Sequence, residues 1–432
     1  MTCIVVVGAQ WGDEGKGKVV DFCTERADVV ARYAGGPNAG HTLVVGGEKT
    51  IVRLLPSGIL HADTRCVLGD GMVVDAAVLL GELDTLQARG VPRVFERVLL
   101  GDRAHLILPY HIAVDAAREA RAATALGTTK KGIGPTYEDK VRRVGVRTGD
   151  LRDPGRLRQR MELALSQWAP TLRELGGNMP SVDSLLAELE PLRQRLVPLL
   201  GDASAAVNEA LGRGARVVLE GAQGALLDVD YGTYPFVTSS SAIAGGACTG
   251  LGLGPSRIDS VLGIAKAYTT RVGSGPFPTE LSDARGEHLR NVGVEFGSVT
   301  GRPRRTGWLD LVALRYAARI NGLDAVALTK LDVLSRLDEV RVCVAYRTSD
   351  GETRDFVDGL DAVEPVYEVF EGWSDDITGV RRIEDLPAPA RRYLDALQEA
   401  LSLPFSMVGV GPGREATLVL RDPFLARTRG SS

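Results

Sequence analysis

The chain has 432 residues, of which 44% are hydrophobic and 25% are charged, and its formal net charge is −4. This composition is typical of a globular protein with a substantial core, and the length allows about two or three structural units. The small negative charge excludes an overall field that would attract nucleic acid or an anionic membrane, so we expect neither as a partner. The five cysteines have no metal-binding spacing and the N-terminus has no signal-peptide pattern, which predicts a cytoplasmic protein.

Runs rich in Val and Ile alternate with helical patterns along the chain, which predicts a mainly parallel sheet with helices on its faces. We expect strands at 3–7, 28–33, 215–220, 259–268 and 325–330, and helices at 19–27, 73–89, 113–125 and 308–320. The Gly46–Gly47 pair predicts a β-hairpin over Thr42–Leu54. Residues 150–200 are rich in Arg, Glu and Leu and predict a helical insertion. Beyond Val340, two strand patterns and a helix near Pro389–Leu401 predict a C-terminal subregion.

The first predicted strand leads into residues 12–19, which read GDEGKGKV. The spacing fits the phosphate loop G-x-x-x-x-G-K-[ST], except that Val19 stands where a hydroxyl would hold Mg²⁺. Backbone N–H groups and the positive end of the next helix bind phosphate in such loops, and Lys16 or Lys18 would neutralise it. The Asp13 carboxylate would repel polyphosphate, so we expect it to be a Mg²⁺ ligand, a base, or both. A glycine turn that only packs the helix is the weaker alternative.

The second strand leads into residues 35–42, which read GGPNAGHT. A surface turn is the ordinary structural role for a lone histidine in a loop. In a parallel sheet, however, this loop lies next to the phosphate loop. Because imidazole titrates near neutral pH, we expect His41 to act as an acid or an oxyanion stabiliser in an active site.

The strand at 325–330 ends in TKLD, residues 329–332, which is similar to the N-K-x-D motif of G-proteins with Thr329 in place of Asn. An aspartate there can accept hydrogen bonds from guanine N1–H and the 2-amino group, a pair of donors that adenine lacks. A helix cap is the usual structural role of such an aspartate. Together with the phosphate loop, Asp332 favours GTP over ATP.

Two basic segments, 141–147 (VRRVGVR) and 300–305 (TGRPRR), supply the local positive charge that anionic substrates would need. Residues 220–226 and 238–246 are polar and follow a strand. They could contact a base edge or a phosphate, or they could form an ordinary hydroxyl-rich loop, and their composition leaves both alternatives open.

These segments together resemble the adenylosuccinate synthetase family. The matching segments include WGDEGKGK at 11–18, GGPNAGHT at 35–42, GTTKKGIGPTYEDK at 127–140, RVGSGPFPTEL at 271–281 and TGRPRRTGWLD at 300–310, and the matches run from residue 4 to about 424. The resemblance implies an α/β fold with a large, mainly parallel central sheet flanked by helices, a P-loop-like nucleotide site, the helical insertion at 150–200 and small β-rich subregions. Residues 1–432 would form one interleaved catalytic domain, in which 340–432 complete the guanine site.

The implied reaction converts IMP, L-aspartate and GTP into adenylosuccinate, GDP and phosphate with Mg²⁺, through 6-phosphoryl-IMP. It is the first committed step from IMP to AMP. The resemblance implies that Asp13 removes the N1 proton, that His41 donates to the charge developing on O6, and that Lys16 neutralises the transferred phosphate. It also implies a homodimer in which Arg143 reaches into the partner's site.

The remaining implied residues fall into four groups by ligand. The GTP-binding residues are Gly12, Gly15, Gly17, Lys18, Gly40, Thr42, Arg304, Lys330, Asp332, Gly409 and Gly411. The IMP-binding residues are Asp13, Asn38, Thr129, Arg143, Gln223, Thr238 and Arg302. The aspartate-binding residues are Val299, Thr300, Arg302 and Arg304, and the metal ligands are Asp13 and the backbone carbonyl of Gly40.

Two other classes of protein would explain part of the pattern. A GTP-hydrolysing switch protein accounts for the phosphate loop and TKLD but leaves His41 and the basic segment at 300–305 without a role. A nucleoside kinase would end the reaction at a stable phosphate ester. Dependence of the reaction on both IMP and aspartate separates the three hypotheses.

Overall fold

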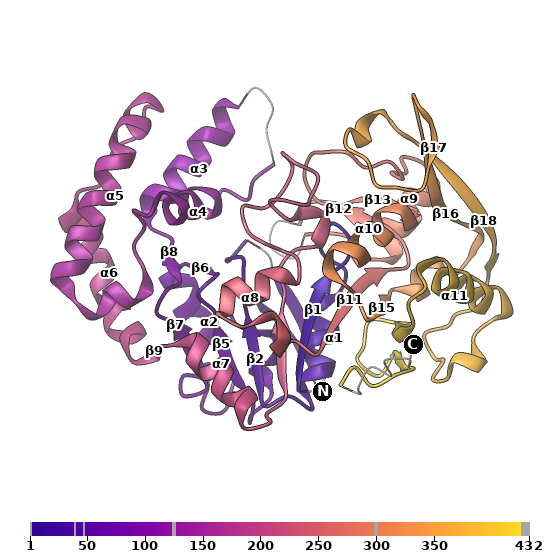
Figure 1. The fold of residues 1–432 in the computed structure, drawn as a ribbon, viewed down its shortest axis with the longest axis horizontal. Coiled ribbons are helices and arrows are strands. Elements are labelled where there is room, and N and C mark those ends of the chain that lie inside the picture. Colours follow the sequence, from indigo (N-terminus) through magenta and orange to yellow (C-terminus); the bar gives the residue numbers. More distant parts are fainter. Residues whose placement is uncertain (1, 39, 46–47, 123–126, 298–300, 425–432) are drawn as a thin grey trace.

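The computed structural model describes residues 2–38, 40–45, 48–122, 127–297 and 301–424. Its centre is a ten-stranded sheet in the order β20-β19-β15-β11-β1-β10-β2-β5-β7-β9, which helices flank (Figure 1). All neighbouring pairs in this sheet are parallel except β19 and β20. The predicted α/β class with a large, mainly parallel sheet is therefore confirmed. The strands are β1 (Cys3–Gly8), β2 (Val29–Arg32), β5 (Arg65–Leu68), β7 (Val98–Gly101), β9 (Leu200–Gly201), β10 (Val217–Glu220), β11 (Ser260–Lys266), β15 (Ala325–Thr329), β19 (Phe405–Gly409) and β20 (Thr417–Val419).

Strand β1 lies at the middle of this sheet, between β10 and β11, and all six of its residues are buried. Its side chains alternate between two hydrophobic clusters: Val5 and Val7 pack on one face, whereas Ile4 and Val6 pack with α1 on the other. A strand covered on both faces needs a continuous apolar run, and this explains the sequence CIVVV. Its carboxyl end is therefore surrounded by the loops that follow the neighbouring parallel strands.

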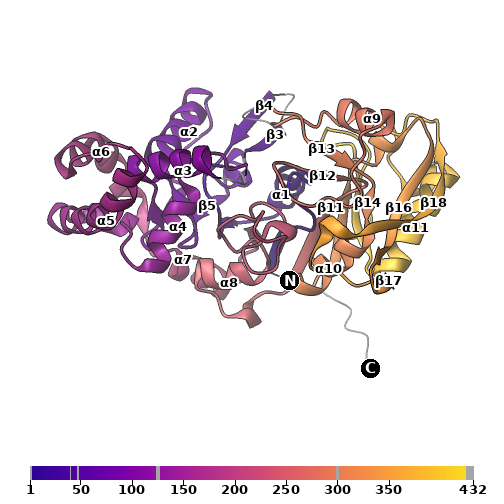
Figure 2. The ribbon, with the colours of Figure 1, turned by 90° about the horizontal axis from the view of Figure 1, so that it is seen from above.

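The helices cover both faces and one end of the sheet (Figures 1 and 2). They are α1 (Lys16–Thr24), α2 (Ala76–Ala88), α3 (Pro109–Arg121), α4 (Ile133–Arg142), α5 (Pro154–Glu174), α6 (Val182–Leu196), α7 (Ala203–Gly212), α8 (Gly245–Leu251), α9 (Ala284–Val292), α10 (Leu311–Asn321) and α11 (Ala388–Leu401). In the part of the chain that the structure describes, no helix has the length and apolar character needed to cross a membrane.

Several helices begin at a residue different from the predicted one, and capping explains two of the shifts. The helix predicted at 73–89 starts at Ala76, because Asp75 accepts a hydrogen bond from the Val78 N–H and the two preceding residues form the short strand β6 (Val73–Val74). The helix predicted at 308–320 starts at Leu311, because Asp310 caps it in the same way through the N–H of Ala313. The helices predicted at 19–27 and 113–125 start earlier, at Lys16 and Pro109, and end at Thr24 and Arg121.

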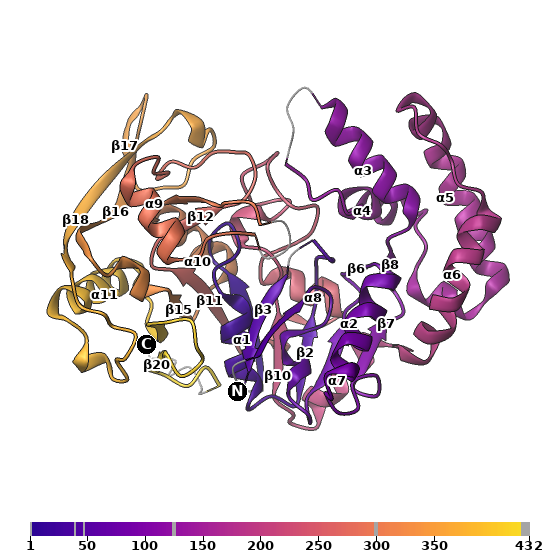
Figure 3. The ribbon, with the colours of Figure 1, turned by 180° about the vertical axis from the view of Figure 1, so that it is seen from behind.

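The predicted hairpin is confirmed, because β3 (His41–Val45) and β4 (Glu48–Val52) pair antiparallel. At the opposite side of the molecule from α5 and α6, α11 packs behind a second sheet (Figure 3). That sheet contains the two strands predicted beyond Val340. Its strands are β14 (Leu309–Asp310), β16 (Leu337–Thr348), β17 (Gly351–Thr353) and β18 (Glu364–Trp373); β12 (Thr269–Arg271) and β13 (Arg305–Gly307) form a separate pair, as do β6 and β8 (His105–Leu106).

Helix α5 is tied to the rest of the fold by a buried polar contact as well as by its apolar face. The indole N–H of Trp168 donates to Asp139 of α4 at 2.8 Å, and His111 of α3 lies 2.9 Å from the other oxygen of the same carboxylate. Burial of a carboxylate is tolerated when donors surround it in this way. The end of α4, where Arg143 stands, is therefore anchored to both α3 and α5.

Candidate active site

The phosphate loop lies between β1 and α1, and three of its residues have a left-handed backbone conformation. Gly12, Asp13 and Gly15 have φ of 89°, 57° and 88°. The buried carboxylate of Glu14 lies inside this loop, where it accepts hydrogen bonds from the N–H groups of Gly12 at 2.8 Å and Gln10 at 3.1 Å. Because Glu14 points inward, it does not face a bound polyphosphate, and of the two acidic residues in the loop only Asp13 is exposed.

The two lysines of the loop have different partners. The Lys16 ammonium lies 2.5 Å from the Glu14 carboxylate and is buried. Lys18 instead donates to the backbone carbonyls of Gly411 at 2.8 Å and Ala416 at 3.2 Å, so it joins α1 to the loop after β19. Desolvation lowers the pKa of Lys18 to about 8, and the nearby Asp332 carboxylate opposes this shift.

The Asp13 side chain is 35% exposed at the mouth of the loop. Its Oδ2 lies 2.7 Å from Nε of Arg304, which comes from the far side of the site. No hydrogen bond to its Oδ1 is present among the described residues. The carboxylate thus keeps one oxygen available for a proton or a metal ion.

His41 stands at the start of β3, and a buried glutamate holds its ring. Nδ1 of His41 lies 2.6 Å from Glu220 at the end of β10 and 3.2 Å from the Ser57 hydroxyl, which itself donates to Glu220 at 2.8 Å. Burial would raise the pKa of Glu220. The nearby His41 ring and Arg32 guanidinium outweigh this effect and hold the pKa of Glu220 below its usual range. The ionised carboxylate keeps a proton on Nδ1, which leaves Nε2 as the ring nitrogen that can meet a substrate.

The TKLD motif contacts the phosphate loop directly. The Thr329 hydroxyl donates to the backbone carbonyl of Glu14 at 2.7 Å, which gives Thr a structural role at the position where G-proteins have Asn. Asp332 has a buried Oδ1 without a hydrogen-bond partner among the described residues, and desolvation raises its pKa. A buried acceptor in this condition is suited to a ligand donor. Gly409 ends β19, the neighbour of β15, and Gly411 follows it, so both lie at the same end of the sheet.

Lys330 does not extend into open space beside Asp332. Its ammonium donates to the carbonyl of Gly293 and to the carboxylate of Glu295, each at 2.6 Å. The backbone of Lys330 is left-handed, with φ of 59°. Arg304 reaches the same carboxylate through Nη1 at 2.7 Å.

Of the residues expected to contact IMP, the structure brings Gln223 and Asn38 together, with Nε2 of Gln223 donating to Oδ1 of Asn38 at 3.4 Å. Oε1 of Gln223 is buried and lacks a partner in the described part of the chain. Thr238 lies 3.2 Å from the Ser240 hydroxyl. Thr129 and Arg143 are exposed, and no hydrogen bond or ion pair in the described part of the chain joins them to this pair; Arg302 is also exposed. Val299 and Thr300 lie outside the described residues, and of Thr42 only the backbone, in β3, is described.

The sequence did not identify three glutamates that position functional groups: Glu14, Glu220 and Glu295. Glu220 ends a predicted strand, and the sequence leaves two alternatives for residues 220–226: contact with a base edge or a phosphate, or an ordinary hydroxyl-rich loop. The structure instead places the first of these residues against a histidine. For Glu220, the signal that could have revealed this role is a carboxylate at the end of an otherwise apolar strand, where burial requires a cationic partner.

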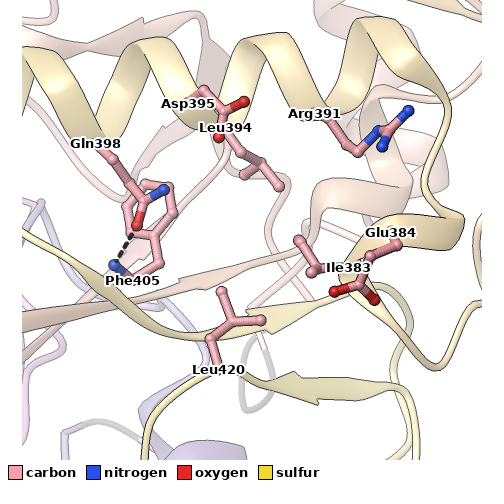
Figure 4. A pocket seen from close by; sticks show the side chains of 8 residues that line it. All are labelled: Ile383, Glu384, Arg391, Leu394, Asp395, Gln398, Phe405 and Leu420. Atoms are coloured by element: carbon pink, nitrogen blue, oxygen red, sulfur yellow. Dashed lines mark hydrogen bonds between the residues drawn. The ribbon is translucent and has the colours of Figure 1, made fainter.

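A separate cavity of about 230 Å³ lies between α11 and β19 and does not include any of these residues (Figure 4). Apolar and charged side chains line it together, and the Gln398 side chain accepts a hydrogen bond from the Phe405 N–H at its edge. The lining residues are Ile383, Glu384, Arg391, Leu394, Asp395, Gln398, Phe405 and Leu420. None of the site residues described above lines this cavity.

Three features meet at the carboxyl ends of parallel strands: a phosphate loop, an aspartate with one buried oxygen on a guanine-type motif, and a histidine held by a glutamate. Together they define a P-loop-like nucleotide-dependent enzyme. Residues 5–418 match the family model described as Adenylosuccinate synthetase. The chain therefore belongs to the adenylosuccinate synthetase family. It is a GTP-dependent ligase that joins IMP and L-aspartate in the synthesis of AMP. The switch-protein and nucleoside-kinase alternatives are thereby excluded.

Individual relatives agree with this assignment. The chain is 62% identical over 427 residues to the adenylosuccinate synthetase of Sorangium cellulosum, with 98% of this chain and 100% of the relative covered. It is 52% identical to the adenylosuccinate synthetase of Myxococcus xanthus, with 98% of this chain and 100% of the relative covered. The fully ligated adenylosuccinate synthetase of Plasmodium falciparum superposes with a TM-score of 0.90 at 36% identity, covering 97% of this chain and 100% of that one. The cyanophage S-2L succinoaminodeoxyadenylate synthetase, at 22% identity and a TM-score of 0.60, shares the fold over 97% of this chain and 95% of that one.

The depressed pKa of Lys18 predicts a pH-dependent stability. Between about pH 8 and the ordinary lysine pKa the unfolded chain binds more protons than the folded chain, so the free energy of unfolding should rise with pH in this window. Lys18→Met removes this contribution and should lower the slope by up to about one proton. Urea titrations from pH 7.5 to 10 measure the slope, and Lys131→Met, which changes an exposed lysine, is the control. An unchanged slope in Lys18→Met would contradict the assignment.

Proposed function

We propose that the chain ligates IMP and aspartate in two steps at the carboxyl end of the sheet. In the first step, O6 of IMP attacks the γ-phosphate of GTP, so that the bond to the β-phosphate oxygen breaks, GDP leaves and 6-phosphoryl-IMP forms. In the second step, the aspartate amine adds at C6 and phosphate leaves, because a phosphate is a far better leaving group than the purine oxygen. The observation that carries this proposal is the contrast between exposed Asp13 and buried Glu14 in the phosphate loop.

Asp13 is proposed as the base that takes the N1 proton of IMP. Removing this proton moves negative charge to O6 and makes it a nucleophile. The ion pair with Arg304 holds the carboxylate at the mouth of the loop. His41, whose Nδ1 is held by Glu220, would donate from Nε2 to the charge on O6 and on the transferred phosphoryl group. Lys16 would compensate phosphate charge from inside the loop.

Mg²⁺ is proposed as the cofactor, with the Asp13 carboxylate and the Gly40 carbonyl as its protein ligands. The donor set fits, because both are hard oxygens and one oxygen of Asp13 has no other partner in the described part of the chain. Across the same residues there is no group of three or more His, Cys, Asp or Glu that could hold a metal, which agrees with an ion that takes most of its ligands from phosphates and water. When bound, Mg²⁺ would withdraw charge from the phosphate oxygens.

The GTP site is proposed to extend from the phosphate loop to the loop after β19. The backbone N–H groups of Gly15 and Gly17 would bind phosphate oxygens at the N-terminus of α1, and Gly12, Gly40 and Thr42 would border them. Asp332 would accept hydrogen bonds from guanine, and its buried unpartnered oxygen supports this. The remaining proposed contacts to GTP are Lys18, Arg304, Lys330, Gly409 and Gly411. Lys18 also holds the loop after β19 in place through the Gly411 carbonyl.

IMP and aspartate are proposed to bind on the other side of the phosphate loop. Buried Gln223 with an unpartnered oxygen, beside Asn38, is suited to a purine edge. Thr129, Thr238, Arg302 and a partner's Arg143 would complete the IMP site. Aspartate would bind to the loop that contains Val299, Thr300, Arg302 and Arg304, where the guanidinium groups suit its two carboxylates.

A homodimer is proposed because the family resemblance assigns Arg143 to a partner's site, and Arg143 is exposed in this chain. Arg143 ends α4 in a left-handed conformation with φ of 65°, and Val141 beside it is 79% exposed. In a dimer, this surface would deliver Arg143 to the partner's site. A cytoplasmic location is also proposed, since the cysteines are unpaired thiols as a reducing compartment would require.

Asp13→Ala tests the proposed base. Loss of the base should lower kcat for adenylosuccinate formation by at least about a hundredfold, while GTP still binds through the loop amides. Initial rates followed by the absorbance of adenylosuccinate, and GTP binding measured by calorimetry, separate the two effects. Asp63→Ala removes an exposed aspartate that also pairs with an arginine, Arg93, and should leave the rate unchanged. Substantial activity in Asp13→Ala would refute the assignment.

Asp332→Asn tests the guanine contact. Replacing the carboxylate with an amide turns one acceptor into a donor, so the ratio of kcat/KM for GTP over ATP should fall about tenfold to a hundredfold. The ratio is measured by competing the two nucleotides at saturating IMP and aspartate. Asp338→Asn, an exposed aspartate six residues further on, is the control. An unchanged ratio in Asp332→Asn would argue for a structural role only.

Mixed dimers test the shared site. Arg143→Ala and Asp13→Ala should each inactivate the homodimer. Random reassociation of the two variants should recover about a quarter of the wild-type activity, because half of the dimers carry one intact site out of two. Differently tagged subunits allow heterodimers to be isolated and assayed. Inactive heterodimers would show that Arg143 does not act across the interface.

A further inference from the structure

Beside the proposed aspartate and guanine sites lies a fully buried carboxylate with three cationic partners. Oε1 of Glu295 lies 2.9 Å from Nζ of Lys266 and 2.6 Å from Nζ of Lys330, and it also accepts the Tyr268 hydroxyl at 2.5 Å. Oε2 lies 2.7 Å from Nη1 of Arg304. The side chain of Glu295 has no exposed surface.

The charges in this cluster do not balance around Glu295 alone. Three cations meet one carboxylate, and the second carboxylate in contact is Asp13, on the other side of the Arg304 guanidinium. Burial would raise the pKa of Glu295, but Lys266, Lys330 and Arg304 together hold it far below its usual range. An ionised carboxylate at this depth orients its donors strongly, because the low local dielectric strengthens each contact.

Glu295 also joins three segments of the chain that are distant in sequence. It follows α9 and precedes the loop expected to bind aspartate, and its backbone carbonyl accepts the N–H of Arg304 at 2.9 Å. Lys266 ends β11 and Lys330 follows β15, and these two strands are parallel neighbours in the central sheet. The Lys330 backbone adopts a left-handed conformation that costs free energy in a residue other than glycine, so the direction of its side chain is imposed by the surroundings.

We propose that Glu295 is a positioning residue that sets Arg304 and Lys330 relative to each other, and so couples the binding of aspartate to the binding of GTP. This inference rests on the proposed function, in which Arg304 serves aspartate and the nucleotide, and Lys330 serves guanine. When GTP draws Lys330 toward the base, Glu295 loses one competing cation and its contact with Arg304 strengthens. The arginine that receives aspartate is thereby ordered by the nucleotide, and aspartate strengthens GTP binding by the same factor.

Glu295→Gln tests the coupling, since it keeps the shape of the side chain and removes its charge. The KM values for GTP and for aspartate should both rise about tenfold, whereas the KM for IMP and kcat should change less than about threefold. A role in stability alone would lower the amount of active enzyme and leave the KM values unchanged. Glu339→Gln is the matched control, because Glu339 also accepts two arginines, Arg285 and Arg341, but lies on β16 outside the site.

Glu295→Asp keeps the charge and shortens the side chain, so it provides the test if the glutamine variant does not fold. It should raise both KM values together by a smaller factor. Lys330→Met completes a double-mutant cycle: removing the competing cation should lower the KM for aspartate in the wild-type background and leave it unchanged when Glu295 is changed. A rise in only one of the two KM values, or equal effects of Lys330→Met in both backgrounds, would overturn the inference. If the wild-type chain formed no adenylosuccinate, the proposed function itself would fail, which is a separate outcome.

Discussion

The geometry of the site depends on the Glu14 carboxylate, which lies inside the phosphate loop and accepts hydrogen bonds from its N–H groups. These contacts hold Gly12 and its neighbours in their left-handed conformations. A Cβ at Gly8 would collide with the carboxylate, so glycine is required there for the close approach. With Glu14 occupying the interior, its neighbour Asp13 is directed outward. Two adjacent acidic residues thereby obtain opposite roles, one structural and one available for chemistry.

The same arrangement recurs twice at the carboxyl end of the sheet. Glu220 holds the ring of His41, and Glu295 holds Lys330 and Arg304. In each case a buried glutamate fixes a positively charged or protonated side chain that can extend toward a ligand. Preorganised groups of this kind lose little entropy when a substrate binds, which favours catalysis by positioning. The site is therefore supported by carboxylates that do not themselves need to contact a substrate.

The sequence was sufficient to predict β15, β11, β1, β10 and β2, which are neighbours at the centre of the sheet, because parallel strands covered on both faces require largely apolar runs. The loop motifs also place Asp13 and His41 directly after two of these strands, since their spacing from the strands is local. The partners of Lys18 and Lys330 could not be predicted in this way. Each side chain contacts groups that are distant in the sequence, and the direction of a long flexible side chain depends on the packed structure.

Helix α1 connects the two ends of the nucleotide site mechanically. Its first turn follows the phosphate loop directly. Lys18 donates to the Gly411 carbonyl, and Glu25, just after the helix, pairs with Arg414, so both residues hold the loop after β19. If GTP binds as proposed, its base and its phosphates would contact two loops that are both held by α1. The fixed distance between these two contacts would then select a nucleotide by its length. A ligand with the right base but a longer or shorter phosphate chain would fit at one end only.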